Sequence, residues 1–179
     1  VSGVASGTVS VTGVVNTVIM TQQTKAYIND NAKVTVSGDI SILADSNNKL
    51  TCWVGAASFA GTVAVGASVN TIKLENKVTA GIGNSVTINQ ANSNDVSNLT
   101  IIATAKDDIF TMVAGIVASG GVSVSASANT ILNTTTVATT IGTGSSINLN
   151  GSLYVKAFHD LVMDLNLGTA SVGAYVGIG

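Results

Sequence analysis

The segment GTVSVTGVVNT at residues 7–17 returns as GTVAVGASVNT at 61–71 and as GGVSVSASANT at 120–130. A fourth, partial copy begins near Gly173, so the spacing between equivalent glycines is 54, 59 and 53 residues. Repeats of this length indicate a stack of similar units that bury their apolar faces against one another. We therefore expect one repeat array over residues 1–179, with modules at 1–50, 51–110 and 111–163 and a partial module at 164–179. Because neither end carries a polar capping repeat, we also expect a fragment of a longer chain.

The likeness between copies extends through the whole module. Each repeated Asn-Thr pair is followed, about ten residues later, by a matching turn: AYI at 26–28, AGI at 80–82 and TTI at 139–141. Two alternating patterns come next: first VTV at 34–36, VTI at 86–88 and INL at 147–149, then ISI at 40–42, LTI at 99–101 and LYV at 153–155. The middle copy inserts QANSNDVSN between the two patterns, which marks a solvent-facing turn there.

The composition is polar without being charged. Charged residues make up 9% of the chain, against about 25% in ordinary soluble domains. The net charge is −2 and the lysines form no run, so we expect no nucleic-acid partner. No charged residue occurs at 1–24, 50–72, 109–155 or 165–179. Valine alternates with Ser, Thr and Gly in these stretches, which is typical of strands, so we expect no membrane span.

Helix signals are scarce and β-branched residues abundant, so the predicted class is all-β. Stacked repeats of about 55 residues suit a β-solenoid (β-helix), with either one wide coil or two ordinary coils in each module, built from several short strands. The alternative architecture is a layered stack of antiparallel hairpins. In that arrangement the uncharged arms on either side of Ser6-Gly7, Ala60-Gly61 and Ser119-Gly120-Gly121 would pair with each other.

Asn16, Asn70 and Asn129 occupy equivalent places in the three copies. Valines at positions 9, 11 and 15 share one parity, whereas Val18 has the other, which suggests that the chain bends at the Asn. Asn suits such a corner because it tolerates left-handed backbone and bonds neighbouring backbone groups. We expect the three amides to form a structural ladder from module to module rather than a ligand site.

The chain has one cysteine and one histidine, Cys52 and His159. A Cys/His nucleophilic pair is formally available, but the repeat argues against it. Cys52 aligns with Met112 and Leu165, which predicts an apolar packing position, and His159 aligns with Ser46 and Lys106 in a variable turn. Zinc needs three or four ligands. We therefore expect no catalytic residue, no bound metal and no cofactor.

Acidic residues recur at similar points of the modules, as Asp45, the pair Asp107 and Asp108, and Asp160. Calcium takes six to eight oxygen ligands, and a row of carboxylates could supply several of them. The preferred interpretation is that these aspartates are solvated turn residues.

Aromatic residues are few, and three of them are candidates for surface binding. Trp53 aligns with Val113 and Asn166, so its position is not reserved for the core. An exposed Trp stacks on sugars or partner side chains at small entropic cost. Tyr27 and Tyr154 are candidates of the same kind.

The succession AYINDNAKVTVSGDISILADSNNKL, followed by VGAASFAGTVAVGASVNTI, resembles the tandem repeats of large bacterial surface exoproteins of the filamentous-haemagglutinin, leukotoxin-like adhesin type. The resemblance covers nearly the whole chain. It implies a secreted or outer-surface β-solenoid that projects a tip from the bacterial cell and is exported by an autotransporter or two-partner route. It carries over no catalytic residue.

The leading functional prediction is a structural stalk or fibre segment of such an adhesin, whose partners are its neighbouring repeats, a surface receptor or glycan, or other copies joined through strand edges. The alternative is a glycan-binding or ice-binding face rich in Thr, as at positions 8, 12, 17, 21 and 134–136, although Gly66 and Ser125 interrupt the column of Thr12. A polysaccharide-degrading β-helix enzyme is a third class. It needs clustered acids, which the sequence does not offer.

Overall fold

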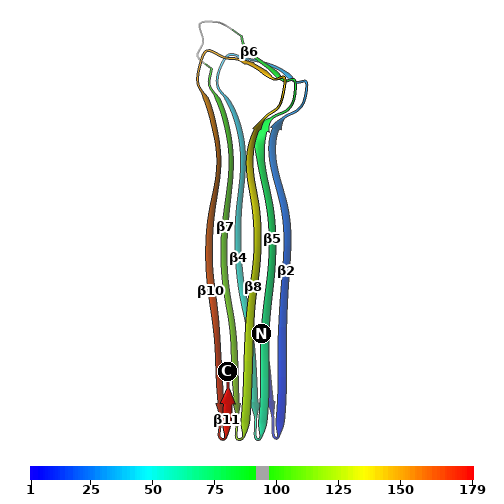
Figure 1. Ribbon diagram of the computed structural model, residues 1–179, viewed down its shortest axis with the longest axis vertical. Helices are drawn as coiled ribbons and strands as arrows, with labels where there is room; N and C mark the ends of the chain where they lie inside the picture. The colour runs from blue at the N-terminus through cyan, green and yellow to red at the C-terminus, as the bar shows by residue number, and fades with distance from the viewer. Residues whose placement is uncertain (92–96) are drawn as a thin grey trace.

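A computed structural model describes residues 1–91 and 97–179 and is all-β within them, which confirms the predicted class (Figure 1). Of the expected insertion, residues 92–96 lie outside the described part. No helix in that part is long and apolar enough to cross a membrane. The strands are β1 (Ser2–Ser6), β2 (Val9–Ile28), β3 (Lys33–Val36), β4 (Ile40–Ala60), β5 (Val63–Ile82), β6 (Thr87–Gln90), β7 (Leu99–Ser119), β8 (Val122–Ile141), β9 (Ser146–Asn148), β10 (Leu153–Gly173) and β11 (Val176–Ile178).

Within the described residues the strands form three sheets, in the orders β1-β4-β7-β10, β11-β8-β5-β2 and β3-β6-β9. Every neighbouring pair in these sheets is parallel. The long strands run side by side from a wide end, where the short third sheet lies, to tight arcs at the opposite end (Figure 1). Each module therefore passes once through all three sheets, and consecutive modules lie next to each other.

The register gives the repeat spacing directly. Val9 lies opposite Val63, Val63 opposite Val122, and Val122 opposite Val176, which are steps of 54, 59 and 54 residues. The last step differs from the expected 53, because Gly173 lies opposite Ser119 rather than Gly120. The prediction that Ile40, Leu99 and Leu153 are equivalent is confirmed.

One expected alignment in the third sheet is wrong. Val34 lies opposite Ile88, and Ile88 lies opposite Ile147, so the strand patterns at 34–36 and 86–88 are displaced by two residues. A displacement of two keeps the same side chains on the same face of a strand. The alternation of apolar residues alone therefore cannot distinguish the two registers.

The strands are much longer than expected. The short strands predicted on either side of the Asn merge into continuous strands of 20 or 21 residues, and each module adds only one further strand of 3 or 4 residues. The corner predicted at Asn16 is wrong, because β2 continues through it. Val9, Val11 and Val15 point outward and Val18 points inward, so their difference in parity reflects an apolar outer face and not a bend.

The alternative of antiparallel hairpins is correct about the reversal of the chain at each Gly arc but wrong about strand pairing, because the two strands that an arc joins do not pair with each other. β4 and β5 follow each other across the arc at Gly61, yet they belong to different sheets. The backbone of each arc bonds the arc of the next module instead: Thr62 N–H donates to Thr8 O at 3.0 Å, and Val122 N–H donates to Thr62 O at 2.9 Å. A Cβ on Gly61 would collide with the backbone oxygen of Gly7, so the close stacking of arcs requires glycine there.

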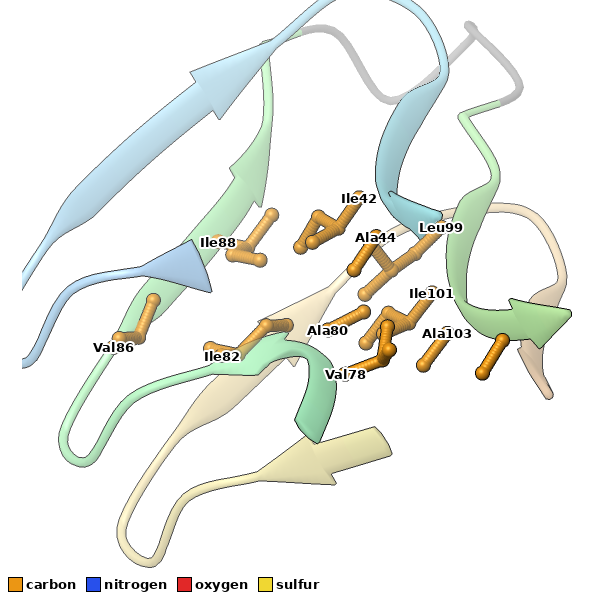
Figure 2. Packing of buried hydrophobic residues seen from close by; sticks show 11 residues of the cluster. Ile42, Ala44, Val78, Ala80, Ile82, Val86, Ile88, Leu99, Ile101 and Ala103 are labelled. Atoms are coloured by element: carbon orange, nitrogen blue, oxygen red, sulfur yellow. The ribbon is translucent and has the colours of Figure 1, made fainter. Parts of the chain in front are cut away.

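The interior differs between the two ends of the long strands. At the wide end, aliphatic side chains of all three sheets pack together, and Ile, Leu and Val fill most of the space (Figure 2): Ile42, Ala44, Val78, Ala80, Ile82, Val86, Ile88, Leu99, Ile101, Ala103 and Ala105. Toward the arcs the buried inner positions are mostly small or polar: Ser10, Thr12, Ala56, Ser58, Ala64, Ser68, Asn70, Ser123 and Ser125. Small side chains let the two long sheets approach closely at that end.

Candidate functional site

A row of asparagine amides crosses the interior between the two long sheets. The side-chain N–H of Asn16 donates to Asn70 Oδ1 at 2.7 Å, and that of Asn70 donates to Asn129 Oδ1 at 2.9 Å. The row ends where Asn129 donates to Thr111 Oγ1 of the facing sheet at 2.7 Å. Parallel, in-register strands place the same residue type at each step, so every amide finds the next as its partner. Each amide of the row therefore donates to a side chain of another strand, which suits a structural role.

Cys52 faces the beginning of this row and is buried. Burial raises the pKa of its thiol, and the hydrogen bond with the Asn16 side chain acts in the opposite direction but more weakly. Cys52 lies opposite Thr111, which in turn lies opposite Leu165. The expected alignment with Met112 is therefore wrong by one residue, and the inward position is not uniformly apolar.

His159 is not near Cys52. It lies opposite Ala105 and, one strand further, in line with Ser46. The row of Ser46 and the row of Cys52 are six residues apart along β4, which is about 20 Å of strand. The two residues form no nucleophilic pair. The expected alignment of His159 with Lys106 is also wrong by one residue, since Lys106 lies opposite Asp160.

A buried carboxylate forms the second polar centre of the interior. Asp107 lies in the middle of β7, and its side chain is fully buried. Its Oδ1 accepts from Asn48 at 2.8 Å and from Asn76 at 3.4 Å, while Oδ2 accepts from the Thr135 hydroxyl at 2.6 Å. The Nε2 of His159 lies 3.0 Å from Oδ2.

Several donors compensate for the burial of this charge. Burial alone raises the pKa of Asp107, but hydrogen bonds from Thr135, Asn48 and His159 together hold the pKa below its usual value. Those three donors come from β8, β4 and β10, and Asn76 comes from β5. One carboxylate thus connects four neighbouring long strands, from both long sheets, to its own strand.

The expectation that the aspartates are solvated turn residues is wrong for Asp107, because that residue lies within a strand and points inward. Asp45, Asp108 and Asp160 also lie within strands but point outward. They do not form a row: Asp45 lies opposite Thr104, Asp108 opposite Lys49, and Asp160 opposite Lys106. Among the described residues no three His, Cys, Asp or Glu side chains are grouped so that they could hold a metal ion.

The three aromatic candidates are exposed but lie apart. Trp53, 62% exposed, lies on the outer face of β4 with its ring 5.5 Å from that of Phe110 on β7. Tyr154 is the second residue of β10, near the wide end, and Tyr27 is the last but one of β2 in the other long sheet. The Tyr27 hydroxyl lies 3.1 Å from Thr140 Oγ1, two strands away, because Gly81 on the strand between leaves room for the ring.

A shallow groove on the same outer face begins at the row of Trp53, Met112 and Asn166. The expected alignment of Trp53 with Val113 is therefore wrong by one residue, because Val113 lies opposite Val54. The groove is lined by Met112, Ala114, Ile116, Asn166, Gly168 and Ala170, with some inward neighbours. Small residues at Ala114 and Gly168 form its floor, between the larger side chains of Met112 and Ile116. The groove belongs to two consecutive modules, so no single repeat would have revealed it.

No protein-family model, curated protein or solved structure matches this chain. The function is therefore argued from the arrangement of its residues. The two buried polar centres connect modules, and the outer surface offers broad faces with a few exposed aromatic side chains.

Sequence reasoning missed two features of these sites. The contact between Asp107 and His159 joins consecutive modules at positions that are not equivalent, so repeat alignment could not indicate it. The apolar outer face was missed because its valines alternate with Ser and Thr as they would in a strand with a valine core. The signal was present in the inward residues of the same parity, most of which are small or polar in all three copies.

Proposed function

We propose that this chain is a β-solenoid segment that serves as a structural part of a bacterial cell-surface adhesin fibre, with no enzymatic activity. The observation that carries the proposal is the pairing of each module with the next in all three sheets. Such an arrangement grows by adding modules, and the polar side chains of its interior, such as Asn70 and Asp107, form hydrogen bonds between modules. Secretion to the bacterial surface by an autotransporter or two-partner route is part of the same proposal and rests on the resemblance of the repeats.

The dimensions favour a broad fibre over a thin stalk. Each module of 54 or 59 residues advances the stack by one strand spacing, about 4.8 Å. The long strands of 20 or 21 residues are about 65–70 Å long. Because a whole module adds only one strand spacing to the length of the fibre, the chain forms a wide fibre with a large surface rather than a long one. We therefore propose that the segment presents wide faces along the fibre as well as carrying a tip.

Cell-surface display tests this proposal. Parent fibres with deleted or added modules are expected to remain exported and to change in length by about 4.8 Å per module in electron micrographs. If adhesion depends on the presence of the tip and not on the number of modules, the segment is only a spacer. Release of reducing ends from acidic polysaccharides by the purified chain would contradict the non-enzymatic assignment.

Glycan binding is a second candidate function, favoured by the exposed ring of Trp53 beside Phe110 and by the groove next to it. Sugar rings stack on such aromatic faces. Binding of the purified chain, carrying a covalent label, to an immobilised glycan array tests this candidate. Loss of glycan binding by the labelled Trp53→Ala variant would support it. No response to any glycan would remove it.

A further inference from the structure

The outer face of the sheet β11-β8-β5-β2 carries rows of similar side chains beside the arcs. Two rows consist of branched residues: Val9, Val63, Val122 and Val176, then Val11, Val65, Val124 and Ile178. A third row has Gly13, Ala67 and Ala126, a fourth has Val15, Val69 and Ala128, and a fifth has Thr17, Thr71 and Thr130. We call these five rows the valine face.

The valine face is exposed although it is apolar. On the edge strand β2, Val9, Val11 and Val15 are 56%, 67% and 75% exposed. Val122 on β8 is 37% exposed, and the valines of β5 are partly exposed. The inner side of the same strands carries polar residues such as Ser10, Ser68 and Asn70, so the apolar residues here are not used for the chain's own core. No row of the face contains a charged residue; the first charges on this sheet are Lys73 and Glu75, which bond each other at 2.7 Å.

We propose that the valine face packs against the valine face of a second copy of this chain, sheet on sheet. The members of each row lie one strand spacing apart in both copies, so side chains of one copy meet side chains of the other at the same interval along the stack. The row of Gly13, Ala67 and Ala126 forms a trough between two rows of larger side chains, into which a row of valines from the second copy fits. No like charges oppose the contact.

The area is close to what a specific interface needs. The five rows extend about 27 Å along the strands, and β2, β5 and β8 cover about 14 Å across them, while β11 adds only to the first two rows. The face therefore covers about 430 Å² on each copy, or about 860 Å² in total, just below the lower limit of about 1,000 Å² for a stable interface. Because each additional module adds another step to every row, the contact strengthens with the length of the array.

The proposal concerns lateral contact between faces and does not depend on the fibre function. Strand edges offer a different contact: β2 and β10 lie at the ends of their sheets, and pairing there would extend the stack instead of thickening it. The two contacts differ in the shape of the oligomer that they produce. They also differ in whether a charged residue introduced on the valine face weakens association.

The test is sedimentation of the purified chain over a range of concentrations, compared with Ala67→Glu and with Thr136→Glu. Ala67 lies at the centre of the face, whereas Thr136 points outward on the same sheet beyond it, opposite Lys77. The unmodified chain and Thr136→Glu are expected to dimerise. Ala67→Glu, which would bury an unpaired charge, is expected to weaken the dimer at least about tenfold. X-ray scattering is expected to show that the dimer is thicker than the monomer in the direction perpendicular to the sheets.

Gly13→Glu provides a second variant, at an outward position where a Cβ meets no atom within 4 Å. Urea midpoints close to that of the unmodified chain establish that either variant folds. A monomer at all concentrations would overturn the proposal. The proposal would also be overturned if the folded Glu variants of the valine face associated as strongly as the unmodified chain, or if the oligomer grew along the stack. Each of these results would assign the contact to the strand edges.

Discussion

The side-chain amide of Asn70 donates a 2.9 Å hydrogen bond to Oδ1 of Asn129, a residue 59 positions further along the chain. Asn70 is fully buried and accepts from Asn16 in the same way. One residue thus connects three modules, and its contacts exist only if the modules lie in register. The stability of the array should therefore depend on this row as a unit.

Asn70→Leu is expected to destabilise the chain by about 2–4 kcal/mol, because it leaves the amides of Asn16 and Asn129 each lacking a partner in the interior. Replacement of Asn16, Asn70 and Asn129 by Leu together with Thr111→Val removes the whole row. It should cost less than the single substitution, since it leaves no member of the row unpaired. Urea unfolding measures both. Additive losses in the fourfold variant would show that the amides act separately.

Asp107→Asn is expected to destabilise the chain at neutral pH by about 1–3 kcal/mol, because Thr135, Asn48 and His159 lose a charged acceptor. The pKa of Asp107 is lower in the folded chain than in the unfolded chain. Its contribution is therefore present above the unfolded value, about 4, and is lost as the pH falls through the folded value. The difference between Asp107→Asn and the unmodified chain should shrink below about pH 4.

The outward-facing neighbour provides the control, since Asp108→Asn leaves the interior network unchanged. Urea unfolding from pH 7 to pH 3 should show little difference between Asp108→Asn and the unmodified chain. A gap for Asp107→Asn that stays constant over this range would contradict the assigned direction of the pKa shift.

Gly81→Ala is expected to cost about 1–3 kcal/mol, because its new Cβ would collide with Thr140 and press on the Tyr27 ring. Gly13→Ala is the matched change on the same sheet, at a position with open space. There the loss of backbone freedom in the unfolded chain should leave stability unchanged or raise it by up to about 1 kcal/mol. Thermal unfolding compares the two, and equal effects would argue against the crossing of Tyr27 over Gly81.

Cys52 should be unreactive in the folded chain, because it is buried and burial raises the pKa of its thiol. Labelling with a thiol reagent near pH 8 is expected to be slow without denaturant and to become fast across the urea transition. Rapid labelling under native conditions would show that the inner space beside Asn16 is open to solvent.

Much of the array was predictable from the sequence, because repeats that pair in register must carry matching residues. The all-β class and the alignment of Ile40 with Leu99 and Leu153 follow from this rule. The length of the strands could not be predicted from this rule. Alternation identifies strand conformation but does not say which parity faces inward, and in the part of the sheet β11-β8-β5-β2 beside the arcs the larger apolar residues face outward.

The candidate site was less predictable for a related reason. Asp107 and its neighbour Asp108 suggested a solvated turn, since two adjacent carboxylates are rare inside a protein. In a strand, adjacent side chains point to opposite faces, so Asp108 lies outside while Asp107 is buried. The partners that permit this burial come from four other strands, and no local pattern contains them.

Duplication of residues 63–121 within the chain tests the central claim most directly. Because Val63 lies opposite Val122, each inserted copy continues the existing register. The account predicts folded arrays whose stack grows by about 4.8 Å for every inserted module, with the dimension along the strands unchanged, as measured by cryo-electron microscopy or X-ray scattering. Growth of about 10 Å per module, or equal growth in all directions, would contradict it.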